Sequence, residues 1–391
     1  MKVISFNIRS GDDPNGHSID ERAPRLKKII EKYDPDIIGF QEVVPKWYPH
    51  VVEDYGEKYE ILHKYRNEET DIEGCSILWK KGAFELLDHG CFWYSETSAV
   101  SSIGPWSREH HFRFCLWSKL REVATGKEFH FFNTHFGGGN ENQIRSAEIL
   151  RAYTETLKAE KLILVGDFNL RDYNDGYKML TEFLMDLNMA TAKDRRITGH
   201  DYDLSREGAP IDFCFISPQT VEPLSYHRID DTIDGKFPSD HCGLLLEMNV
   251  LDSIRLGAVV LSEKGEDETA HVDQVRKIRG ALAKGRADIA IIHQSDEVMR
   301  EKVSHLYRYI KQGGELKSTL RFAQEGEILW DPSRFELVCP LEGGVVLKKG
   351  ASEREFTVLA EGEKLLLNGK PLNPSAKCAE EPINFADYII K

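Results

Sequence analysis

Six short polar clusters stand in the first part of this chain of 391 residues, and each one follows or ends a short apolar run. They are Ser5-Phe6-Asn7-Ile8-Arg9, Phe40-Gln41-Glu42-Val43, Asn133-Thr134-His135-Phe136, Gly166-Asp167-Phe168-Asn169, Ile211-Asp212-Phe213 and Ser239-Asp240-His241. Carboxylate and amide oxygens are ligands that a hard cation such as Mg²⁺ prefers, and imidazoles with further carboxylates can bind phosphate and transfer protons. Because such side chains can converge at strand ends, the set predicts a metal-assisted phosphoesterase.

The elements that would position these clusters are short strands mixed with helices. Residues 3–8 form an apolar strand, residues 19–33 show helical periodicity, and residues 36–40 form a second buried strand that ends at Gln41-Glu42. Further strands are predicted over 76–79, 84–87, 112–120, 128–134, 161–165, 211–217 and 242–250, and further helices over 143–159 and 176–187. Because strands outnumber helices and hairpins mix with helical crossovers, we expect an α/β fold of two packed sheets flanked by helices, rather than a doubly wound parallel sheet.

The composition bounds the class of protein. With 41% hydrophobic and 30% charged residues, the sequence is that of an ordinary globular protein, and it is long enough for two domains. Its formal net charge of −14 opposes non-specific binding to DNA or RNA, because such binding depends on Lys and Arg side chains that neutralise phosphates. We therefore expect a small or short phosphate ester as substrate, with nucleic acid possible but not favoured.

The cysteines and the first residues indicate the compartment. Seven cysteines, none of them in a C-x-x-C pair, predict buried free thiols rather than disulfides or a zinc site. Residues 1–6 lead directly into a strand without the apolar core of a signal peptide, and no apolar stretch reaches the length of about 18 residues that a membrane span needs. We expect a cytoplasmic protein without a membrane partner.

The part of the chain after residue 250 echoes the part before it. Two stretches repeat with the same spacing, so that Ile328-Leu329-Trp330 and Phe335-Glu336-Leu337 match Ile77-Leu78-Trp79 and Phe84-Glu85-Leu86. We therefore predict a domain over 1–250 that carries the chemistry and a smaller α/β domain over 251–391, which is a degenerate, non-catalytic half-copy of the first. The alternative is an unrelated α+β domain with a chance match.

The polar motifs are not repeated in this second part. Asn7 is matched by roughly Ser262, and Glu42 is matched by Gln294 or Ser295, depending on the gap. We therefore expect no catalysis there.

Residues 1–250, with the six motifs in this order and spacing, resemble the endonuclease/exonuclease/phosphatase superfamily, in the style of a bacterial group of metal-dependent hydrolases. Each motif alone is a weak signal, and six in order are a strong one. The resemblance implies a four-layer α/β sandwich of the DNase I-like type, with the site at one edge of two packed sheets. It also implies hydrolysis of a phosphate mono- or diester by in-line attack of an activated water.

The resemblance assigns three residues to a metal site. Glu42 would hold Mg²⁺ directly, with Mn²⁺ as a possible substitute, and Asn7 would ligate the ion or orient its water. Asp240 would bind a second metal or a metal-bound water. Without the other motifs, Glu42 would be read as a solvated carboxylate at a strand end.

Two further residues take their roles from the resemblance of Gly166-Asp167-Phe168-Asn169 to the family motif G-D-F-N. Asp167 would orient and deprotonate the attacking water, and Asn169 would hold the phosphate or the nucleophile. The same four residues could instead form a tight turn in which Asp and Asn bond to the backbone.

The histidines resemble the pair that binds the scissile phosphate in this family. They are His135 and His241. Asp212 is expected to accept a hydrogen bond from His241 and to favour its charged form. Glu73 is the candidate partner of His135.

Four residues at the rim are expected to bind substrate. Arg9, Trp106 and Arg113 fit the bacterial group, and His200 resembles its mid-chain histidine. Arg9 stands where DNA-repair members carry a carboxylate, which argues against an abasic-site endonuclease. After Phe136 this chain has Gly137-Gly138-Gly139 in place of Asp-His, so two polar groups are absent from the rim. The aromatic loop that contains Trp106 could stack a base or a sugar, or could belong to the core.

Two other functions stay open from the sequence. One is a nuclease of the same superfamily, which a basic groove and salt-sensitive binding of oligonucleotides would favour. The other is a binding or scaffold protein that kept the fold and lost activity. The complete set of motif residues argues against the scaffold.

Overall fold

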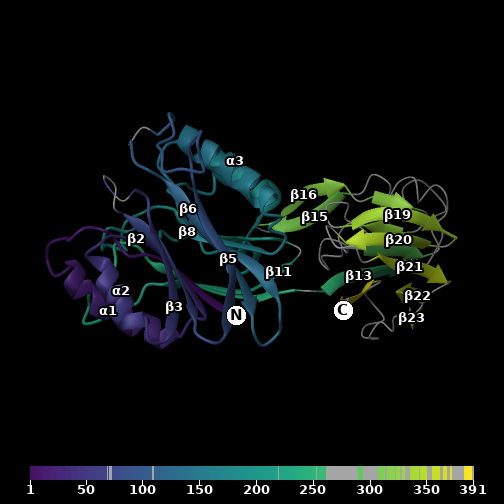
Figure 1. Ribbon diagram of the computed structural model, residues 1–391, viewed down its shortest axis with the longest axis horizontal. Helices are drawn as coiled ribbons and strands as arrows, with labels where there is room; N and C mark the ends of the chain where they lie inside the picture. Colours follow the sequence, from purple (N-terminus) through teal and green to yellow (C-terminus); the bar gives the residue numbers. More distant parts are fainter. Residues whose placement is uncertain are drawn as a thin grey trace. The chain divides into compact units, whose positions relative to one another are not determined.

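The computed structural model describes residues 1–251 apart from 68, 70–72, 108–109 and 219. Beyond residue 251 it describes residues 253–260, 289–293, 307–312, 315–321, 323–325, 328–330, 335–342, 344–349, 355–361, 364–367, 370–371 and 383–389. The chain divides into two compact units, Met1–Leu251 and Asp252–Lys391 (Figure 1).

The first unit is built on two six-stranded mixed sheets. The first sheet has the order β11-β12-β1-β2-β4-β3, with β1 (Lys2–Asn7), β2 (Ile37–Val43), β3 (Tyr59–Tyr65), β4 (Gly74–Lys80), β11 (Val221–Ile229) and β12 (Gly243–Val250). The second has the order β5-β6-β7-β8-β10-β9, with β5 (Phe84–Trp93), β6 (Phe114–Glu122), β7 (Glu128–His135), β8 (Leu162–Asp167), β9 (Met185–Asp186) and β10 (Asp212–Ile216). Only β1–β2 and β7–β8 are parallel among the pairs of these two sheets. Both parallel pairs end in predicted site residues.

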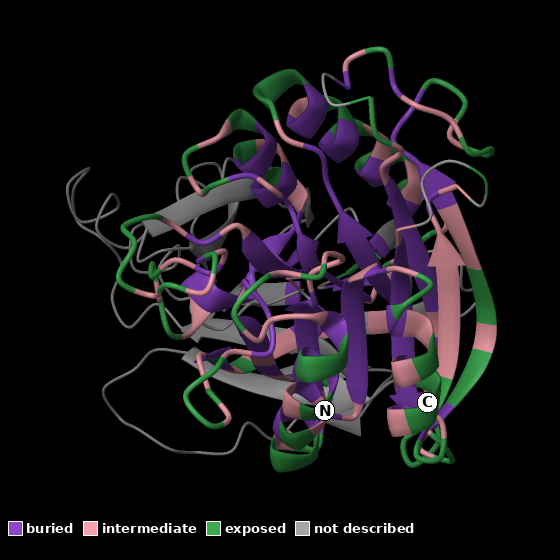
Figure 2. Cartoon of the chain, turned by 90° about the vertical axis from the view of Figure 1, so that its left-hand side faces the viewer, coloured by how far each residue is buried: buried purple, intermediate pink, exposed green. Residues whose placement is uncertain are grey.

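The sheets pack face to face, and helices cover their outer faces. Helices α1 (Ile19–Tyr33) and α2 (Trp47–Tyr55) lie against the first sheet, and α3 (Asn140–Thr156) lies against the second (Figure 1). Helix α4 (Asp175–Phe183) packs in the same core cluster as α3. Between the sheets, Asn133 of β7 donates to the carbonyls of Phe40 and Ser76 (both 2.9 Å). Figure 2 shows the buried residues on the central strands and the exposed residues on the outer helix faces and loops. The predicted four-layer α/β sandwich is confirmed.

Most predicted elements of this unit are present, with two kinds of difference. Helix α1 has the predicted bounds, and a capping box between Ser18 and Glu21 fixes its start. The helix predicted over 176–187 ends at Phe183, because Asp186 ends β9 and caps the short helix α5 (Leu187–Ala190). Elements α2, β3 and β11 were not predicted. Helix α2 contains a proline, and β11 is interrupted by a bulge that begins at Pro223.

The second unit repeats the strand order of the first sheet. Its first sheet, β17-β18-β14-β13-β24, contains β13 (Ser253–Val260), β14 (Ile289–His293), β17 (Ala323–Glu325), β18 (Ile328–Trp330) and β24 (Ile383–Ile389). This order matches β3-β4-β2-β1-β12, and each pair has the same parallel or antiparallel sense in both units. The other strands are β15 (Tyr307–Gln312), β16 (Glu315–Arg321), β19 (Phe335–Leu341), β20 (Gly344–Lys349), β21 (Glu355–Glu361), β22 (Lys364–Leu367) and β23 (Lys370–Pro371).

The strand registers of the second unit agree with those of the first unit residue by residue. Trp330 pairs with Ile289 as Trp79 pairs with Ile37. The β19–β20 pair is irregular after Leu337, and the β5–β6 pair is irregular at the equivalent point, after Leu86. We propose on these registers that residues 251–391 are a shortened copy of the first half of the first unit.

The same registers place Val260 opposite His293, where Asn7 stands opposite Gln41. The expected match of Asn7 with roughly Ser262 was therefore two residues too late, and the copy has an apolar residue where the first unit has its amide. The candidates for Glu42, Gln294 and Ser295, lie outside the described residues.

None of the helices in the described part of the chain combines the length and apolar character needed to cross a bilayer. The cysteines in that part are free thiols: Cys75, Cys91, Cys115, Cys214, Cys242 and Cys339.

Candidate active site

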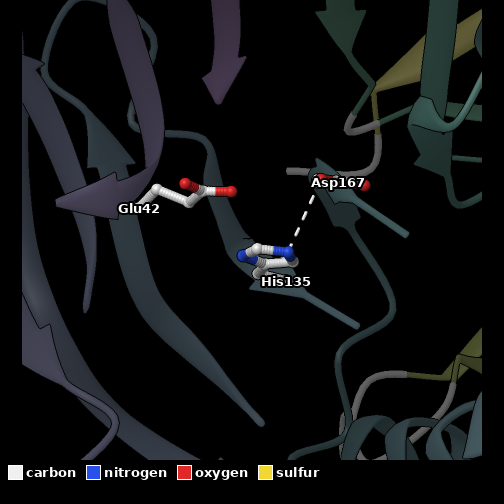
Figure 3. A group of neighbouring side chains, drawn as sticks. All are labelled: Glu42, His135 and Asp167. Carbon is white, nitrogen blue, oxygen red and sulfur yellow. Dashed lines mark ion pairs between the residues drawn. The ribbon is translucent and has the colours of Figure 1, made fainter. Parts of the chain in front are cut away.

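The predicted site residues converge at one end of the two sheets of the first unit. Asn7, His135 and Asp167 are the last residues of β1, β7 and β8, and Asp212 is the first residue of β10. Glu42 is the penultimate residue of β2. Figure 3 shows Glu42, His135 and Asp167 around one space. The convergence follows from parallel strands ending at the same edge, together with an antiparallel neighbour that begins there.

The Asn7 amide joins two carboxylates from different sheets. Its Nδ2 donates to Glu42 Oε1 (2.9 Å) and to Asp167 Oδ2 (3.0 Å). The other oxygen of Glu42 accepts from the backbone N–H (2.7 Å) and the hydroxyl (2.8 Å) of Ser10. Burial opposes ionisation of Glu42, but the hydrogen bonds from Asn7 and Ser10 outweigh it and lower its pKa. Glu42 is therefore an ionised carboxylate at neutral pH.

Asp167 is the buried carboxylate at the centre of the site. Burial, and then the charge of Asp212, raise the pKa of Asp167 to about 7. Its Oδ1 accepts from the backbone N–H of Asn169 (2.9 Å). Asp167 belongs to two groups whose ligand atoms lie within 4.8 Å of one another, one with Glu42 and His135 and the other with Asp212 and His241. The spacing of both groups suits a cation, but the second contains His241, whose Nδ1 is bound to Asp212, so the group with Glu42 and His135 is the better candidate.

His241 is paired with a carboxylate as predicted. Its Nδ1 donates to Asp212 Oδ2 (2.9 Å), and its Nε2 lies 3.9 Å from Asp167 Oδ2. Burial favours the neutral ring, but the Asp212 carboxylate and this hydrogen bond hold the pKa of His241 well above its ordinary value. The imidazole is therefore charged at neutral pH.

His135 has the opposite environment. Its Nδ1 lies 3.3 Å from Glu73 Oε1, so the predicted partner is in place. Sequence reasoning missed Arg66, a buried side chain that forms an ion pair with Glu73 and lies 3.1 Å from the same ring nitrogen. Burial, and then the positive charges of Arg113 and Arg66, hold the pKa of His135 well below its ordinary value. An arginine in a loop carries no sequence signal for this role.

Three site residues sit in the left-handed backbone region that disfavours side chains. They are Arg9 (φ 62°), Glu42 (φ 64°) and Asn169 (φ 47°). Asn169 also donates from Nδ2 to the carbonyl of Phe136 (3.0 Å), and the same Nδ2 lies 3.1 Å from His135 Nε2. Strained backbone of this kind is retained where a side chain must point in a particular direction.

The predicted rim residues lie in different environments. Arg9 is half-exposed and binds both oxygens of Asp13. Arg113 is half-buried near His135. Trp106 lines a recess of about 390 Å³ beside α3. His200 is wholly buried and packs on Phe237, with ring centroids 4.7 Å apart.

Asp240 lies outside both groups that could hold a cation. Its Oδ2 lies 3.6 Å from Arg9 Nε, and burial raises its pKa. The metal role of Asp240 and the substrate contacts of the four rim residues stay predictions.

The comparisons with known proteins agree with this geometry. A family model described as the Endonuclease/Exonuclease/phosphatase family matches residues 4–241. The chain belongs to this family. Human tyrosyl-DNA phosphodiesterase 2 is 23% identical over 280 residues, which cover 64% of this chain and 68% of that protein.

Two solved structures from Bacteroides thetaiotaomicron share the fold. A family protein is 26% identical with a TM-score of 0.59, covering 63% of this chain and 97% of that one. A mannosyl-6-phosphatase is 24% identical with a TM-score of 0.58, covering 64% of this chain and 99% of that one. Family membership, together with the assembled carboxylates and histidines, identifies this chain as a hydrolase of phosphate ester bonds.

Proposed function

We propose that this chain hydrolyses a small phosphate mono- or diester with the help of a divalent cation, Mg²⁺ or Mn²⁺, by in-line attack of water. The observation that carries the proposal is the Asn7 amide, which joins Glu42 to Asp167 beside the charged Asp212–His241 pair. This arrangement provides an ionised ligand, a base and an acid within one buried site.

The donor set fits a hard divalent cation. Glu42 would hold it, because carboxylate oxygens are ligands that Mg²⁺ and Mn²⁺ prefer. Asn7 turns Nδ2 toward the two carboxylates, while its Oδ1 accepts from the backbone N–H of Arg9 (3.0 Å), so its amide would ligate the ion only after turning over and would otherwise orient a water on it. The pKa of Asp167, raised to about 7 by burial and by Asp212, supports this fit, since a cation would offset the crowding of negative charge. When bound, the cation would stabilise negative charge on the phosphate oxygens.

Different side chains of the site have different roles in proton transfer and phosphate binding. With a pKa near the operating pH, Asp167 can accept a proton from the attacking water. His241, which is charged through Asp212, can donate a hydrogen bond from Nε2 to a phosphate oxygen. His135 is neutral and lies beside Asn169, so these two side chains can orient the phosphate by hydrogen bonds without adding charge.

The substrate class follows from access and charge. Asp167 and His135 are only 2% and 4% exposed, so only a small part of a substrate can contact them. Together with the net charge of −14, this favours a small or short ester. The name of the human relative, tyrosyl-DNA phosphodiesterase 2, keeps a nuclease as the second candidate. The cytoplasmic location expected from the sequence stays a prediction.

The test is an assay of the full chain with Mg²⁺, Mn²⁺ or EDTA against bis-p-nitrophenyl phosphate, p-nitrophenyl phosphate, sugar phosphates and oligonucleotides. Asp167→Asn is expected to lower kcat by at least about a hundredfold. Asp186→Asn is the matched control, because Asp186 is also buried with its pKa raised to about 6 but caps α5, away from the site.

Turnover that survives EDTA, or that persists in Asp167→Asn, would overturn the proposal. No turnover on any substrate, together with no binding of Mg²⁺, would favour the scaffold reading. The best substrate decides between a phosphatase and a nuclease.

A further inference from the structure

The Asp212–His241 pair joins the two sheets of the first unit. Asp212 opens β10 in the second sheet, and His241 lies two residues before β12 in the first. These strands belong to different sheets, so no shared ladder of backbone hydrogen bonds fixes their spacing. The distance of 2.9 Å between His241 Nδ1 and Asp212 Oδ2 must therefore be set by something else.

Thr198 lies between the two partners and is bonded to both sides. Its hydroxyl oxygen accepts from the backbone N–H groups of Ile211 (3.0 Å) and Asp212 (3.1 Å). Its carbonyl accepts from the backbone N–H of Cys242 (2.8 Å), the residue after His241. Thr198 is wholly buried, so water does not compete for these bonds.

The residues that follow Thr198 complete the connection to His241. Gly199 forms an antiparallel bridge with His241, and the backbone N–H of His200 donates to the carbonyl of Asp240 (2.7 Å). On its other side, the carbonyl of Ile197 accepts from Arg228 Nη1 of β11 (2.7 Å). The backbone of this short segment is thus fixed to the first sheet, and the Thr198 hydroxyl is its link to Asp212.

We propose that Thr198 is a positioning residue whose hydroxyl sets the place of Asp212 relative to His241. The proposal rests on the proposed hydrolase function, in which His241 binds the phosphate. A hydroxyl fits this task because it can accept from two N–H groups at once. Without it, the backbone N–H groups of Ile211 and Asp212 at the start of β10 would lose the acceptor that ties them to the Thr198 segment.

The test compares Thr198→Val, which keeps the shape but removes the acceptor, with Thr198→Ser, which keeps the acceptor. Thr220→Val is the matched control, because the Thr220 hydroxyl is also buried but donates to the carbonyl of Glu160 (2.6 Å), beyond the other end of β10. Each full-length variant is assayed for kcat and KM, and its thermal unfolding is recorded to confirm that it is folded.

A second readout does not depend on activity. In protein labelled with ¹⁵N-histidine, the Nδ1–H proton of His241 is followed by NMR and is identified by its absence in His241→Gln. We expect Thr198→Val to lower kcat by about ten- to a hundredfold, with a smaller change in KM, and to lose this proton signal. Thr198→Ser and Thr220→Val should keep both the wild-type kcat and the Nδ1–H signal of His241.

The proposal is overturned if Thr198→Val keeps the signal and the wild-type kcat, or if Thr198→Ser loses as much as Thr198→Val. If the wild type hydrolyses no substrate, the proposed function fails, while the NMR signal still decides the role of Thr198. If Thr198→Val does not fold, Thr198→Cys replaces it, because a thiol is a weak acceptor and should give the same loss.

Discussion

At the scale of single residues, the two histidines of the site are held in opposite charge states by their neighbours. His241 is hydrogen-bonded to the Asp212 carboxylate, which raises its pKa, whereas His135 shares Glu73 with the guanidinium of Arg66. Groups whose surroundings separate their pKa values can take different roles in one reaction. The division of labour between these rings is therefore a property of their partners.

The charge state of His241 predicts a pH dependence of stability. Because its folded pKa is raised, its ion pair with Asp212 stabilises the protein fully below about pH 6.5, the ordinary histidine value, and less as the pH rises through the raised value. We expect Asp212→Asn to lower the free energy of unfolding by about 3 kcal/mol near pH 6, with a smaller effect at higher pH. Urea unfolding in EDTA across this range measures it. An effect that grows with pH would contradict the assignment.

Arg66 predicts a large and specific loss of stability. Its side chain is 3% exposed, so removing it leaves Glu73 without its buried counter-charge. Arg66→Met is expected to cost about 3–5 kcal/mol in the free energy of unfolding, and adding Glu73→Gln should recover part of that cost.

Arg121 is the control for this measurement. It is 39% exposed and is paired with Glu128, so Arg121→Met should cost less than about 1 kcal/mol in urea unfolding. Equal losses for the two arginine variants would show that the Arg66 pair is an ordinary surface contact.

Residues with a motif were predictable and residues that support the motif were not. Asn7, Asp167 and the histidines stand in recognisable clusters at strand ends, so sequence alone could place them together. Arg66 and Thr198 act through contacts with residues distant in the chain, and neither stands in a pattern. Their roles depend on tertiary packing, which the local sequence does not encode.

At the scale of elements, the site depends on how closely β7 and β8 approach at their ends. Gly166 has a φ of 155°, and a Cβ at this position would lie 2.0 Å from the carbonyl oxygen of Thr134. That contact forbids any side chain, so β8 can deliver Asp167 to the site only with glycine before it. The glycine of the G-D-F-N motif is therefore a structural requirement for placing Asp167.

Gly166→Ala is expected to shift the end of β8 and to lower both kcat and stability, the latter by about 1–3 kcal/mol. Gly82→Ala is the control, because Gly82 also has positive φ (75°) but has no atom within 4 Å of the added Cβ. The control should be less destabilised and should keep its activity. Thermal unfolding and the phosphoesterase assay measure the two effects. Full activity in Gly166→Ala would contradict the close-approach argument.

The strands and helices with clear periodicity were predictable, and the weaker ones were decided by packing. Helix α1 has a capping box and a regular apolar face, and its bounds were predicted correctly. Strand β3 is an edge strand with mixed exposure, so it lacks a clean alternation. Strand β11 is broken by its bulge. These elements form because a neighbouring strand is available to pair with them.

At the scale of the whole molecule, the two units share strand order, pairing sense and register in one sheet. The sequence echo at Trp79 and Trp330 pointed to this relationship because both residues are buried core positions, where packing restrains change. In the proposed copy, which we predict to be non-catalytic, the positions of the site residues are free of that restraint. This accounts for Val260 at the position of Asn7 in the proposed copy.

The charge of the whole chain predicts weak binding to nucleic acid. Beyond the net charge of −14, cations near the site are already engaged, since Arg9 is paired with Asp13 and Arg66 with Glu73. In EDTA, fluorescence anisotropy with single- and double-stranded oligonucleotides should show a Kd no tighter than about 10⁻⁵ M and only a small dependence on salt.

A nuclease with a basic groove would behave differently. Its affinity would fall by about a thousandfold or more between about 50 and 200 mM salt, because several phosphate contacts release counterions. The variant Arg9→Ala tests whether Arg9 belongs to a basic groove that binds nucleic acid. If Arg9 lies in such a groove, the variant should reduce the salt slope by about one, and otherwise it should leave oligonucleotide binding unchanged. Steep salt dependence that Arg9→Ala reduces would move the substrate class from small esters to nucleic acid.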